Sequence, residues 1–505
     1  MPLVTLLDRR PCSWLVLGAV LSAFTLFQTP IAALGWLAAV PWLRYVRLRP
    51  GWRGASAVFF MALLAGNAAV VRIITDPLPL AMAPLFGLPI GFFVALPFVA
   101  LAFLKVDGAR RILAFALLAT LSEVAQRTGT PFLSWGSAAY TQMENLPLMQ
   151  VASLGGLSAV SLLVHAVGAT LEAALAGDRV RRPAIAVATT VLVAQVWGAA
   201  RLHSSEFHAT DTAVVAAIDT PSDIGGPDLP DAATVADWNA ILASRTRRAA
   251  AAGAELAVWT EASTLVLPGD VDTFHAFLGD LAAETGLELV VGYVVPLPGE
   301  RFQYENTYVF VRPDGSVDHT YLKHEPVPGE PAVRGTAPQQ VVETDVGRVG
   351  GAVCYDYDAP YIGVGHARLG ADLVALPSSD WRGIDPVHTR MAAVRAIEGG
   401  HSVLRSTRWG LSAGIDPQGR MQAQRSAFDD PDDGVLLARL PRSGRTTLFS
   451  ALGDGGVGAL LLLALAATLL SARYARPGEF DRPHDRGARR PGGLRGAGDR
   501  PPAAA

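Results

Sequence analysis

The chain has 505 residues, of which 50% are hydrophobic and only 17% are charged. A soluble domain usually carries about 25% charged residues, so this composition argues against a wholly soluble protein. The formal net charge of -3 carries little information, because the charges are unevenly placed along the chain. The two cysteines, Cys12 and Cys354, lie too far apart in sequence to indicate a disulfide framework.

The first two fifths of the chain is a series of apolar stretches, each near the roughly 20 residues that cross a hydrocarbon core. We predict seven spans, at 13–28, 30–46, 55–73, 84–105, 109–127, 152–176 and 183–201. Buried helices of a soluble protein are the alternative, but seven nearly uncharged stretches in a row argue against it. We therefore expect a membrane domain over residues 1–201.

The charges of the connecting loops predict an orientation. Arginine and lysine fall in alternate connections, at 8–10, 44–53, 105–111 and 178–182. By the positive-inside rule these loops are cytoplasmic, so residues 202–446 would emerge on the other side. An eighth span within 447–475 would bring the Arg/Gly/Pro-rich tail, 476–505, back to the cytoplasm, where we expect it to be disordered. This arrangement predicts a multi-pass protein of the bacterial cytoplasmic (inner) membrane with residues 202–446 on the periplasmic side.

Residues 202–446 differ in kind from the apolar stretches. Strand-like runs such as "TAVVAAI" (212–218) and "LELVVGYVV" (287–295) alternate with helix-like segments near 232–252 and 271–286. Alternating segments with continuous apolar strands indicate an α/β domain with a covered sheet. The predicted fold class is thus a multi-pass α-helical membrane domain plus an extracytoplasmic α/β domain.

Three polar residues of the α/β domain end or follow strand-like runs. Glu261 ends "ELAVWTE", Lys323 follows "VDHTYL" and Cys354 ends "VGGAVC"; Lys323 is one of only two lysines in the chain, the other being Lys105. A carboxylate can take the proton of a thiol, and a lysine can stabilise the oxyanion that forms when the thiolate attacks a carbonyl. Each residue taken alone also has an ordinary explanation: a buried thiol, a helix cap or surface charge, and a solvated loop lysine.

Other polar groups give weaker signals. His366, His388 and His401 lack metal-ligand spacing, and we expect them to be structural or surface groups. Glu123, near the outer end of the fifth span, is a functional candidate or, more simply, a structural anchor. No phosphate loop, dinucleotide fingerprint or zinc motif is present in the sequence, so we expect no cofactor, no metal and no nucleic-acid partner.

Three motifs in order, "WTEAST", "YLKHEPVPGEP" and "GGAVCYDYD", resemble the Glu–Lys–Cys pattern of the nitrilase, or carbon–nitrogen hydrolase, superfamily. Together with the predicted spans, and with the segments 122–142 and 390–420, they resemble the apolipoprotein N-acyltransferase family. The resemblance implies a four-layer αββα sandwich. It also implies that Glu261 is the general base, Lys323 the oxyanion stabiliser and Cys354 the nucleophile.

The same resemblance implies supporting roles for further residues. Glu330 would support the lysine, and Tyr355 matches the aromatic residue that follows the nucleophile. Trp259 lies beside the base, where pocket shaping and simple packing are both open. Asp356 departs from the family, which usually has Glu there, although a shorter carboxylate can still orient its neighbours. The segment "LPSSDWRGI" (376–384) also departs from it, and its composition suggests an apolar arm that dips into lipid.

The activity that the resemblance implies is transfer of an acyl chain from a membrane phospholipid, through a cysteine thioester, to the N-terminal amine of diacylglyceryl-cysteine on an apolipoprotein. The partners would be these two lipid substrates, and we expect a membrane-embedded monomer. Two alternatives stay open: a membrane-anchored amidase or hydrolase that passes the acyl group to water, and a nitrilase-like scaffold without catalytic activity.

Overall fold

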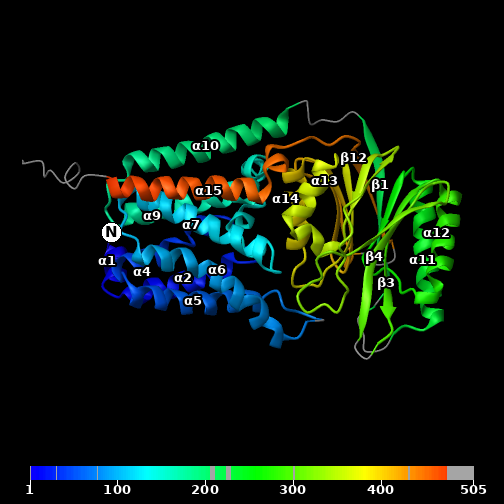
Figure 1. Ribbon diagram of the computed structural model, residues 1–505, viewed down its shortest axis with the longest axis horizontal. Helices are drawn as coiled ribbons and strands as arrows, with labels where there is room; N and C mark the ends of the chain where they lie inside the picture. The colour runs from blue at the N-terminus through cyan, green and yellow to red at the C-terminus, as the bar shows by residue number, and fades with distance from the viewer. Residues whose placement is uncertain are drawn as a thin grey trace, which may run out of the picture.

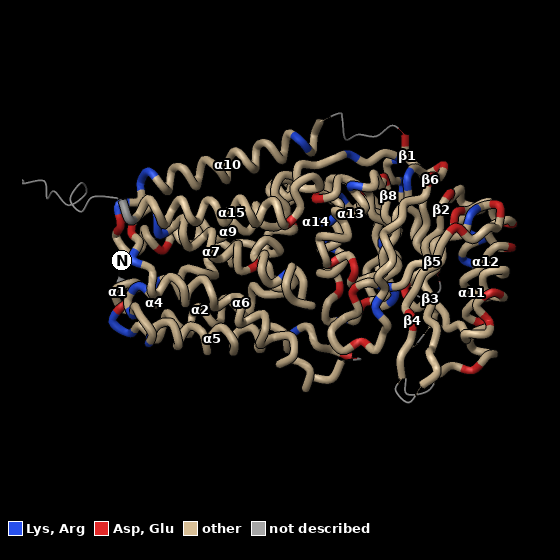
Figure 2. The backbone as a smooth tube through the Cα atoms, in the orientation of Figure 1, with Lys and Arg blue, Asp and Glu red and all other residues tan. Residues whose placement is uncertain are grey.

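A computed structural model describes residues 2–29, 31–76, 78–204, 211–222, 224, 229–299, 302–429 and 433–474. The chain forms a bundle of helices at one end and an α/β sandwich at the other (Figure 1). Lys and Arg gather at the end of the bundle that carries the N-terminus, whereas the length of the helices is almost free of charge (Figure 2). The predicted tail, 476–505, lies outside the described residues.

The bundle contains the N-terminal helices and the last helix of the chain. Its helices are α1 (Pro2–Asp8), α2 (Pro11–Thr25), α3 (Ala33–Leu37), α4 (Val40–Leu48), α5 (Trp52–Val71), α6 (Ala83–Phe103), α7 (Gly108–Gly129), α8 (Leu146–Met149), α9 (Ala152–Leu175), α10 (Arg181–His203) and α15 (Leu448–Tyr474). Short 3-10 turns, η1 (Leu80–Met82) and η2 (Ala138–Gln142), join some of them.

Within the described ranges, five helices are long and apolar enough to cross a membrane. They are Trp52–Val71, Leu80–Phe103, Ala152–Leu175, Arg181–His203 and Leu448–Ala472. At the other predicted spans, α2 has only 15 residues, the second stretch is divided between α3 and α4, and α7 carries several charged side chains. The chain is thus a membrane protein, and the count of eight spans stays a prediction.

Small residues let the membrane helices approach closely. A Cβ added at Gly66 of α5 would lie 2.4 Å from the carbonyl oxygen of Gly87 in α6, and one at Gly91 would lie 2.5 Å from the carbonyl oxygen of Ala62. In lipid the helices gain stability from such close packing, because hydrophobic exclusion no longer favours their association.

The α/β half holds two six-stranded sheets. The first has the order β12 (Val435–Pro441), β1 (Thr212–Ile218), β2 (Leu256–Trp259), β3 (Glu288–Leu297), β4 (Gln303–Val311) and β5 (Val317–Leu322). The second has the order β11 (Met421–Ser426), β10 (Leu411–Ile415), β9 (Ser402–Arg408), β8 (Leu373–Ser379), β7 (Gly347–Gly351) and β6 (Val341–Thr344). β1, β2 and β3 run parallel, as do β7, β8 and β9.

The alternation of strand side chains divides the domain into four layers, as the resemblance implied. Val215 of β1 packs between the two sheets, and the next residue, Ala216, faces α11 (Ala232–Ala251) and α12 (Val271–Thr285). Helices α13 (Pro360–Arg368) and α14 (Val387–Gly399) cover the second sheet and face the membrane helices (Figure 1).

The two halves share one hydrophobic core. Membrane-half residues such as Phe27, Ile73 and Leu157 cluster with Ile362 and Met391 of α13 and α14. The segment 376–384, whose composition suggested an apolar arm that dips into lipid, contacts the membrane half of the protein. The indole Nε1 of Trp381 donates to the carbonyl of Ile73 at 2.6 Å, and Gln28 Nε2 donates to the carbonyl of Gly383 at 2.7 Å.

Glu123 occupies the anchoring position that its neighbours suggested. Its carboxylate accepts hydrogen bonds from Ser137 Oγ at 2.5 Å, Ser161 Oγ at 2.6 Å and the Ala138 amide at 3.1 Å, and it lies 2.8 Å from His165 Nε2. These bonds hold the loop after α7 against α9, and the same loop contacts the α/β half, where Trp135 donates to Asp358 Oδ2 at 2.8 Å.

Candidate active site

The three residues singled out at strand ends converge in space. Glu261 and Lys323 follow β2 and β5, and Cys354 begins the 3-10 turn η5 (Cys354–Asp358) after β7. Lys323 Nζ donates to Glu261 Oε1 at 2.8 Å, and the charges of both residues act on the Cys354 thiol. β2 and β5 run in the same direction in the first sheet, so Glu261 and Lys323 lie at the same edge, and the packing of the two sheets brings Cys354 from the second sheet to them.

Glu330 completes a buried charge cluster with Lys323. Its Oε2 accepts from Lys323 Nζ at 2.9 Å and from the amide of Val327 at 2.8 Å. Its Oε1 accepts from Tyr304 and from Asn306 Nδ2, each at 3.0 Å, and Asn306 Nδ2 also donates to Glu261 Oε1 at 2.7 Å. Asn306 therefore ties both carboxylates together, so the position of each depends on the other.

The electrostatics of this cluster favour an ammonium beside a protonated thiol. Burial alone would favour a neutral amine, but the carboxylates of Glu261 and Glu330 outweigh it and hold the pKa of Lys323 above its usual value. Burial, together with the negative charge of Glu261, raises the pKa of the Cys354 thiol, against the opposing charge of Lys323. A thiol in this state needs a base at the moment of attack, and Glu261 is within the same cluster.

The backbone presents Cys354 on a sharp turn. Its φ of 49° lies in the left-handed region, which a residue with a Cβ seldom adopts. The Sγ donates to the carbonyl of Ser379, at the end of β8, at 3.2 Å. Such strain persists only where the surroundings hold it, and it is characteristic of functional sites.

Asp356 links the nucleophile turn to the lysine loop. One carboxylate oxygen accepts from the amides of His324 and Glu325 at 2.9 and 2.6 Å. The other accepts from the amide of Val353 at 2.9 Å and from Tyr321 Oη at 3.0 Å. The shorter side chain thus reaches both segments, although burial raises the pKa of Asp356 to about 7.

Replacing Asp356 by alanine is expected to lower the unfolding free energy by about 3 kcal/mol or more, because three buried amides and a hydroxyl would lose their acceptor. Asp356→Asn keeps one oxygen and should cost less. The thermal unfolding midpoint of the detergent-solubilised protein should decrease from the wild type to Asp356→Asn and again to Asp356→Ala. An alanine variant as stable as the wild type would contradict this role.

The two aromatic residues predicted near the site, Tyr355 and Trp259, occupy different positions: one lies in the cavity wall and the other does not. Tyr355 is part of the cavity wall, and its hydroxyl donates to the carbonyl of Pro131, in the loop after α7, at 2.9 Å. Trp259 is fully buried in the layer between the first sheet and α11, where its Nε1 donates to Thr246 Oγ1 at 2.9 Å. The packing alternative therefore describes the position of Trp259.

The charged cluster opens into a cavity of about 690 Å³. Glu261, Lys323, Glu330 and Cys354 lie in its wall, together with Trp381 and Ile384 from the segment after β8. The α/β half adds further apolar lining residues such as Leu265, Val294 and Phe302. The membrane half supplies the rest of the apolar wall, which includes Phe27, Ile73, Ile74, Leu78, Met82, Phe86, Ile90, Phe132 and Trp135. A reacting group at the sulfur would therefore share one space with a long apolar chain.

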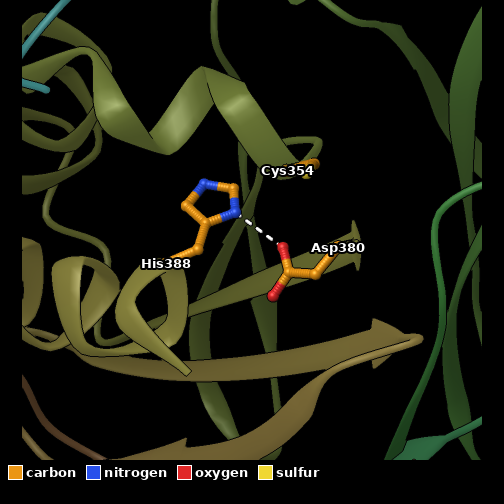
Figure 3. A group of neighbouring side chains, drawn as sticks. All are labelled: Cys354, Asp380 and His388. Atoms are coloured by element: carbon orange, nitrogen blue, oxygen red, sulfur yellow. Dashed lines mark hydrogen bonds and ion pairs between the residues drawn. The ribbon is translucent and has the colours of Figure 1, made fainter. Parts of the chain in front are cut away.

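Of the two alternatives for the three histidines, structural or surface groups, the surface alternative is wrong, because all three are buried. His366 and His401 are fully buried in the packing of the domain, but His388 lies in the wall of the cavity. Its Nδ1 lies 2.6 Å from Asp380 Oδ1 and its Nε2 lies 3.1 Å from Asp358 Oδ1. Figure 3 shows His388 and Asp380 joined beside Cys354. Spacing along the chain gave no sign of this contact.

One ligand atom from each of Cys354, Asp380 and His388 lies within 4.8 Å of the others, a grouping that can in principle hold a metal ion. Both ring nitrogens of His388 already face carboxylates, and Asp380 is paired with Arg405 Nη2 at 2.9 Å. This donor set fits a hydrogen-bonded ion cluster better than a metal centre, since a metal ligand needs a free imidazole lone pair.

The His388 cluster predicts a pH-dependent stability. Burial opposes a charged imidazole, but Asp358 and Asp380 outweigh it and raise the pKa of His388 to about 9, from an ordinary value of 6.5. Because the pKa of His388 is higher in the folded than in the unfolded protein, its protonation stabilises the fold. This contribution is fully present below pH 6.5 and is lost as pH rises through 9. We expect the unfolding free energy to fall by about 3 kcal/mol, which would appear as a lower thermal unfolding midpoint. A midpoint that falls equally in His388→Gln would contradict it.

Three other residues near the site were not predicted from the sequence. Asn306 and Tyr304 lie two residues apart in β4 and therefore share a face, which a period-2 pattern in "YENTY" could have indicated. Arg405, in β9, gave no signal, because nothing in "SVLRSTR" distinguishes this buried guanidinium from those of the chain's many other arginines.

Two family models match successive parts of the chain. A family model described as "Carbon-nitrogen hydrolase" matches residues 214–447, and one described as "Apolipoprotein N-acyltransferase N-terminal domain" matches residues 18–170. Among solved structures, an amidase from Nesterenkonia sp. covers 46% of this chain and 91% of its own, with 21% identity and a TM-score of 0.38.

Curated relatives named apolipoprotein N-acyltransferase cover most of the chain. The protein from Geobacter metallireducens is 26% identical over 519 residues, which span 94% of this chain and 98% of the relative. The protein from Azotobacter vinelandii is 28% identical over 477 residues, spanning 85% of this chain and 88% of the relative. The chain thus combines, in order, an N-terminal domain similar to that of apolipoprotein N-acyltransferases with a carbon–nitrogen hydrolase domain, and it is similar along almost its whole length to relatives named apolipoprotein N-acyltransferase.

Proposed function

We propose that this protein transfers an acyl chain from a membrane phospholipid to the N-terminal amine of diacylglyceryl-cysteine on apolipoproteins. The observation that carries the proposal is the cavity itself. It joins the Glu261–Lys323–Cys354 cluster to an apolar wall that the helices and loops of the membrane half help to build. A small soluble amide would leave most of such a wall without contacts, whereas a lipid acyl chain would fill the space beside it.

In the first half-reaction Glu261 takes the proton of the Cys354 thiol as sulfur attacks the ester carbonyl of the phospholipid. The carbonyl oxygen becomes an oxyanion, which the Lys323 ammonium stabilises. The bond between the carbonyl carbon and the glycerol oxygen then breaks. The leaving lysophospholipid oxygen takes the proton from Glu261, and a thioester remains on Cys354.

In the second half-reaction the amine of the diacylated cysteine attacks the thioester carbonyl. Glu261 takes a proton from the amine, Lys323 again stabilises the oxyanion, and the carbon–sulfur bond breaks to leave an amide. The thiolate then recovers the proton from Glu261. Dividing the transfer into two steps lets one nucleophile and one base serve both.

The proposed setting is the bacterial cytoplasmic membrane with the α/β half on the periplasmic side. The concentration of Lys and Arg at the opposite end of the helices supports this orientation (Figure 2). We further propose that the protein acts as a monomer, since Glu261, Lys323 and Cys354 and both parts of the cavity wall come from one chain.

Intact-mass spectrometry of the purified protein incubated with phospholipid tests the proposal. The expected result is a mass increase of one acyl group, which disappears on addition of a diacylated lipopeptide as triacylated peptide forms. Release of free fatty acid without triacylated peptide would instead identify a membrane-anchored hydrolase. Absence of any adduct under conditions where the protein is folded would favour a non-catalytic scaffold.

A further inference from the structure

A second buried ion cluster lies beside the nucleophile. Asp380 contacts Arg405 through two bonds, from Nη1 to Oδ2 at 3.0 Å and from Nη2 to Oδ1 at 2.9 Å. Its Oδ1 also lies 2.6 Å from His388 Nδ1, and the opposite ring nitrogen, Nε2, lies 3.1 Å from Asp358 Oδ1. The side chains of all four residues are at most 3% exposed, so their charges act on one another with little screening by water.

The cluster bridges the two segments that hold the sulfur. Asp358 ends the turn η5 that Cys354 begins, and Asp380 directly follows Ser379, whose carbonyl accepts from Cys354 Sγ at 3.2 Å. His388 reaches across from α14 and contacts both aspartates. Movement of this ring would therefore change the distance between the nucleophile turn and the end of β8.

The membrane half reinforces the same contact. Trp135, in the loop after α7, donates from Nε1 to Asp358 Oδ2 at 2.8 Å. Its ring lies against the His388 ring, with centroids 5.7 Å apart. Asp358 is thus held by one donor from each half of the protein, and His388 is packed between its partners and the cavity wall.

We infer that His388 is a positioning residue for the proposed acyl transfer: as an imidazolium held by Asp358 and Asp380, it fixes the turn that carries Cys354 and favours the thiolate. The inference rests on Cys354 being the nucleophile. His388 does not act as the base, because both ring nitrogens face carboxylates rather than the thiol.

The charges around His388 determine the sign of the effect. The groups that face it are Asp358 and Cys354 of η5, Asp380 after β8, Arg405 of β9 and the uncharged Trp135. Arg405 Nη2 approaches Nδ1 to 2.9 Å, and Asp380 Oδ1, which both contact, offsets the repulsion between the two cations. Two cations and two anions balance, so removing the imidazolium leaves one net negative charge near the sulfur.

The test measures thiol reactivity and needs no lipid. Full-length protein in detergent is alkylated with iodoacetamide between pH 6 and pH 10, in a Cys12→Ser background because Cys12 is exposed and Cys354 is the only other cysteine. His388→Gln and the smaller His388→Asn are compared with His366→Gln. His366 is an equally buried histidine that packs against Gly350 and is not among the described residues lining the cavity.

For both His388 variants we expect alkylation of Cys354 to slow about tenfold or more below pH 9, with the pH profile displaced upward by about one unit or more. His366→Gln should keep the profile of the Cys12→Ser background. This readout is independent of the acyl donor, so it can succeed where the acylation assay fails, and the two proposals are tested separately.

Three outcomes would overturn the inference. The first is an unchanged alkylation profile in a folded His388 variant. The second is an equal displacement in His366→Gln, which would show a general effect of losing a buried histidine. The third is failure of both His388 variants to fold while His366→Gln folds, which would make His388 a purely structural residue.

Discussion

The Cys354→Ala variant is expected to form no acyl adduct and to lose transfer to a diacylated lipopeptide by about four orders of magnitude or more. Cys354 Sγ is the one thiol in the cavity, and it lies on a turn with a φ of 49°, beside the charges of Glu261 and Lys323. Alanine keeps the small volume of the side chain, so the fold should survive while the reaction loses its covalent step.

Intact-mass analysis and a lipopeptide gel-shift measure the two losses separately. Cys12→Ala provides the matched control, because this exposed thiol lies at the start of α2 and should leave both readouts unchanged. Cys354→Ser gives a further comparison, since a hydroxyl is harder to deprotonate than a thiol and should retain only a trace of activity. Transfer at the wild-type rate by Cys354→Ala would refute a thioester mechanism.

Replacing Lys323 by methionine is expected to lower kcat by about three orders of magnitude or more. One part of the loss is the donor that stabilises the oxyanion, which alone contributes a factor of about 100 to 1,000 in related chemistry. The other part is the base. Without the ammonium that bonds to both at 2.8 and 2.9 Å, Glu261 and Glu330 would be two buried carboxylates tied by Asn306. They would then hold a proton between them, and Glu261 could not accept one from the thiol.

Rates of acyl-enzyme formation, followed by mass spectrometry after mixing with phospholipid, give the effect on the first half-reaction. Lys105→Met is the matched control, because Lys105 is the other lysine of the chain and lies exposed between α6 and α7. A Lys323→Met variant that acylates within tenfold of the wild-type rate would exclude the lysine from oxyanion stabilisation.

The sequence is informative where one residue carries a local signal. Glu261, Lys323 and Cys354 each follow a strand, and strand ends collect functional side chains, so the pattern marked all three as candidates. Their meeting also depends on the packing of two sheets, because Cys354 follows a strand of the second sheet. The long apolar helices could also be predicted from the sequence, because length and hydropathy are local properties.

Contacts made across the fold left no such signal. His388 meets Asp358 and Asp380 through the packing of α14 on the second sheet, and nothing in the spacing of these three residues along the chain specifies that packing. The break between α3 and α4 was missed for a related reason. An apolar stretch reports that a segment avoids water, but not whether it is one straight helix.

The hydrophobic core shared by α13, α14 and the membrane helices makes the membrane segment part of the active site. A carbon–nitrogen hydrolase domain released from its helices would keep its charged residues and lose Phe27, Phe86 and Phe132 from the cavity wall. Its nucleophile would then open onto a cavity that lacks one side of its apolar wall. The membrane segment is therefore more than a tether for the α/β half.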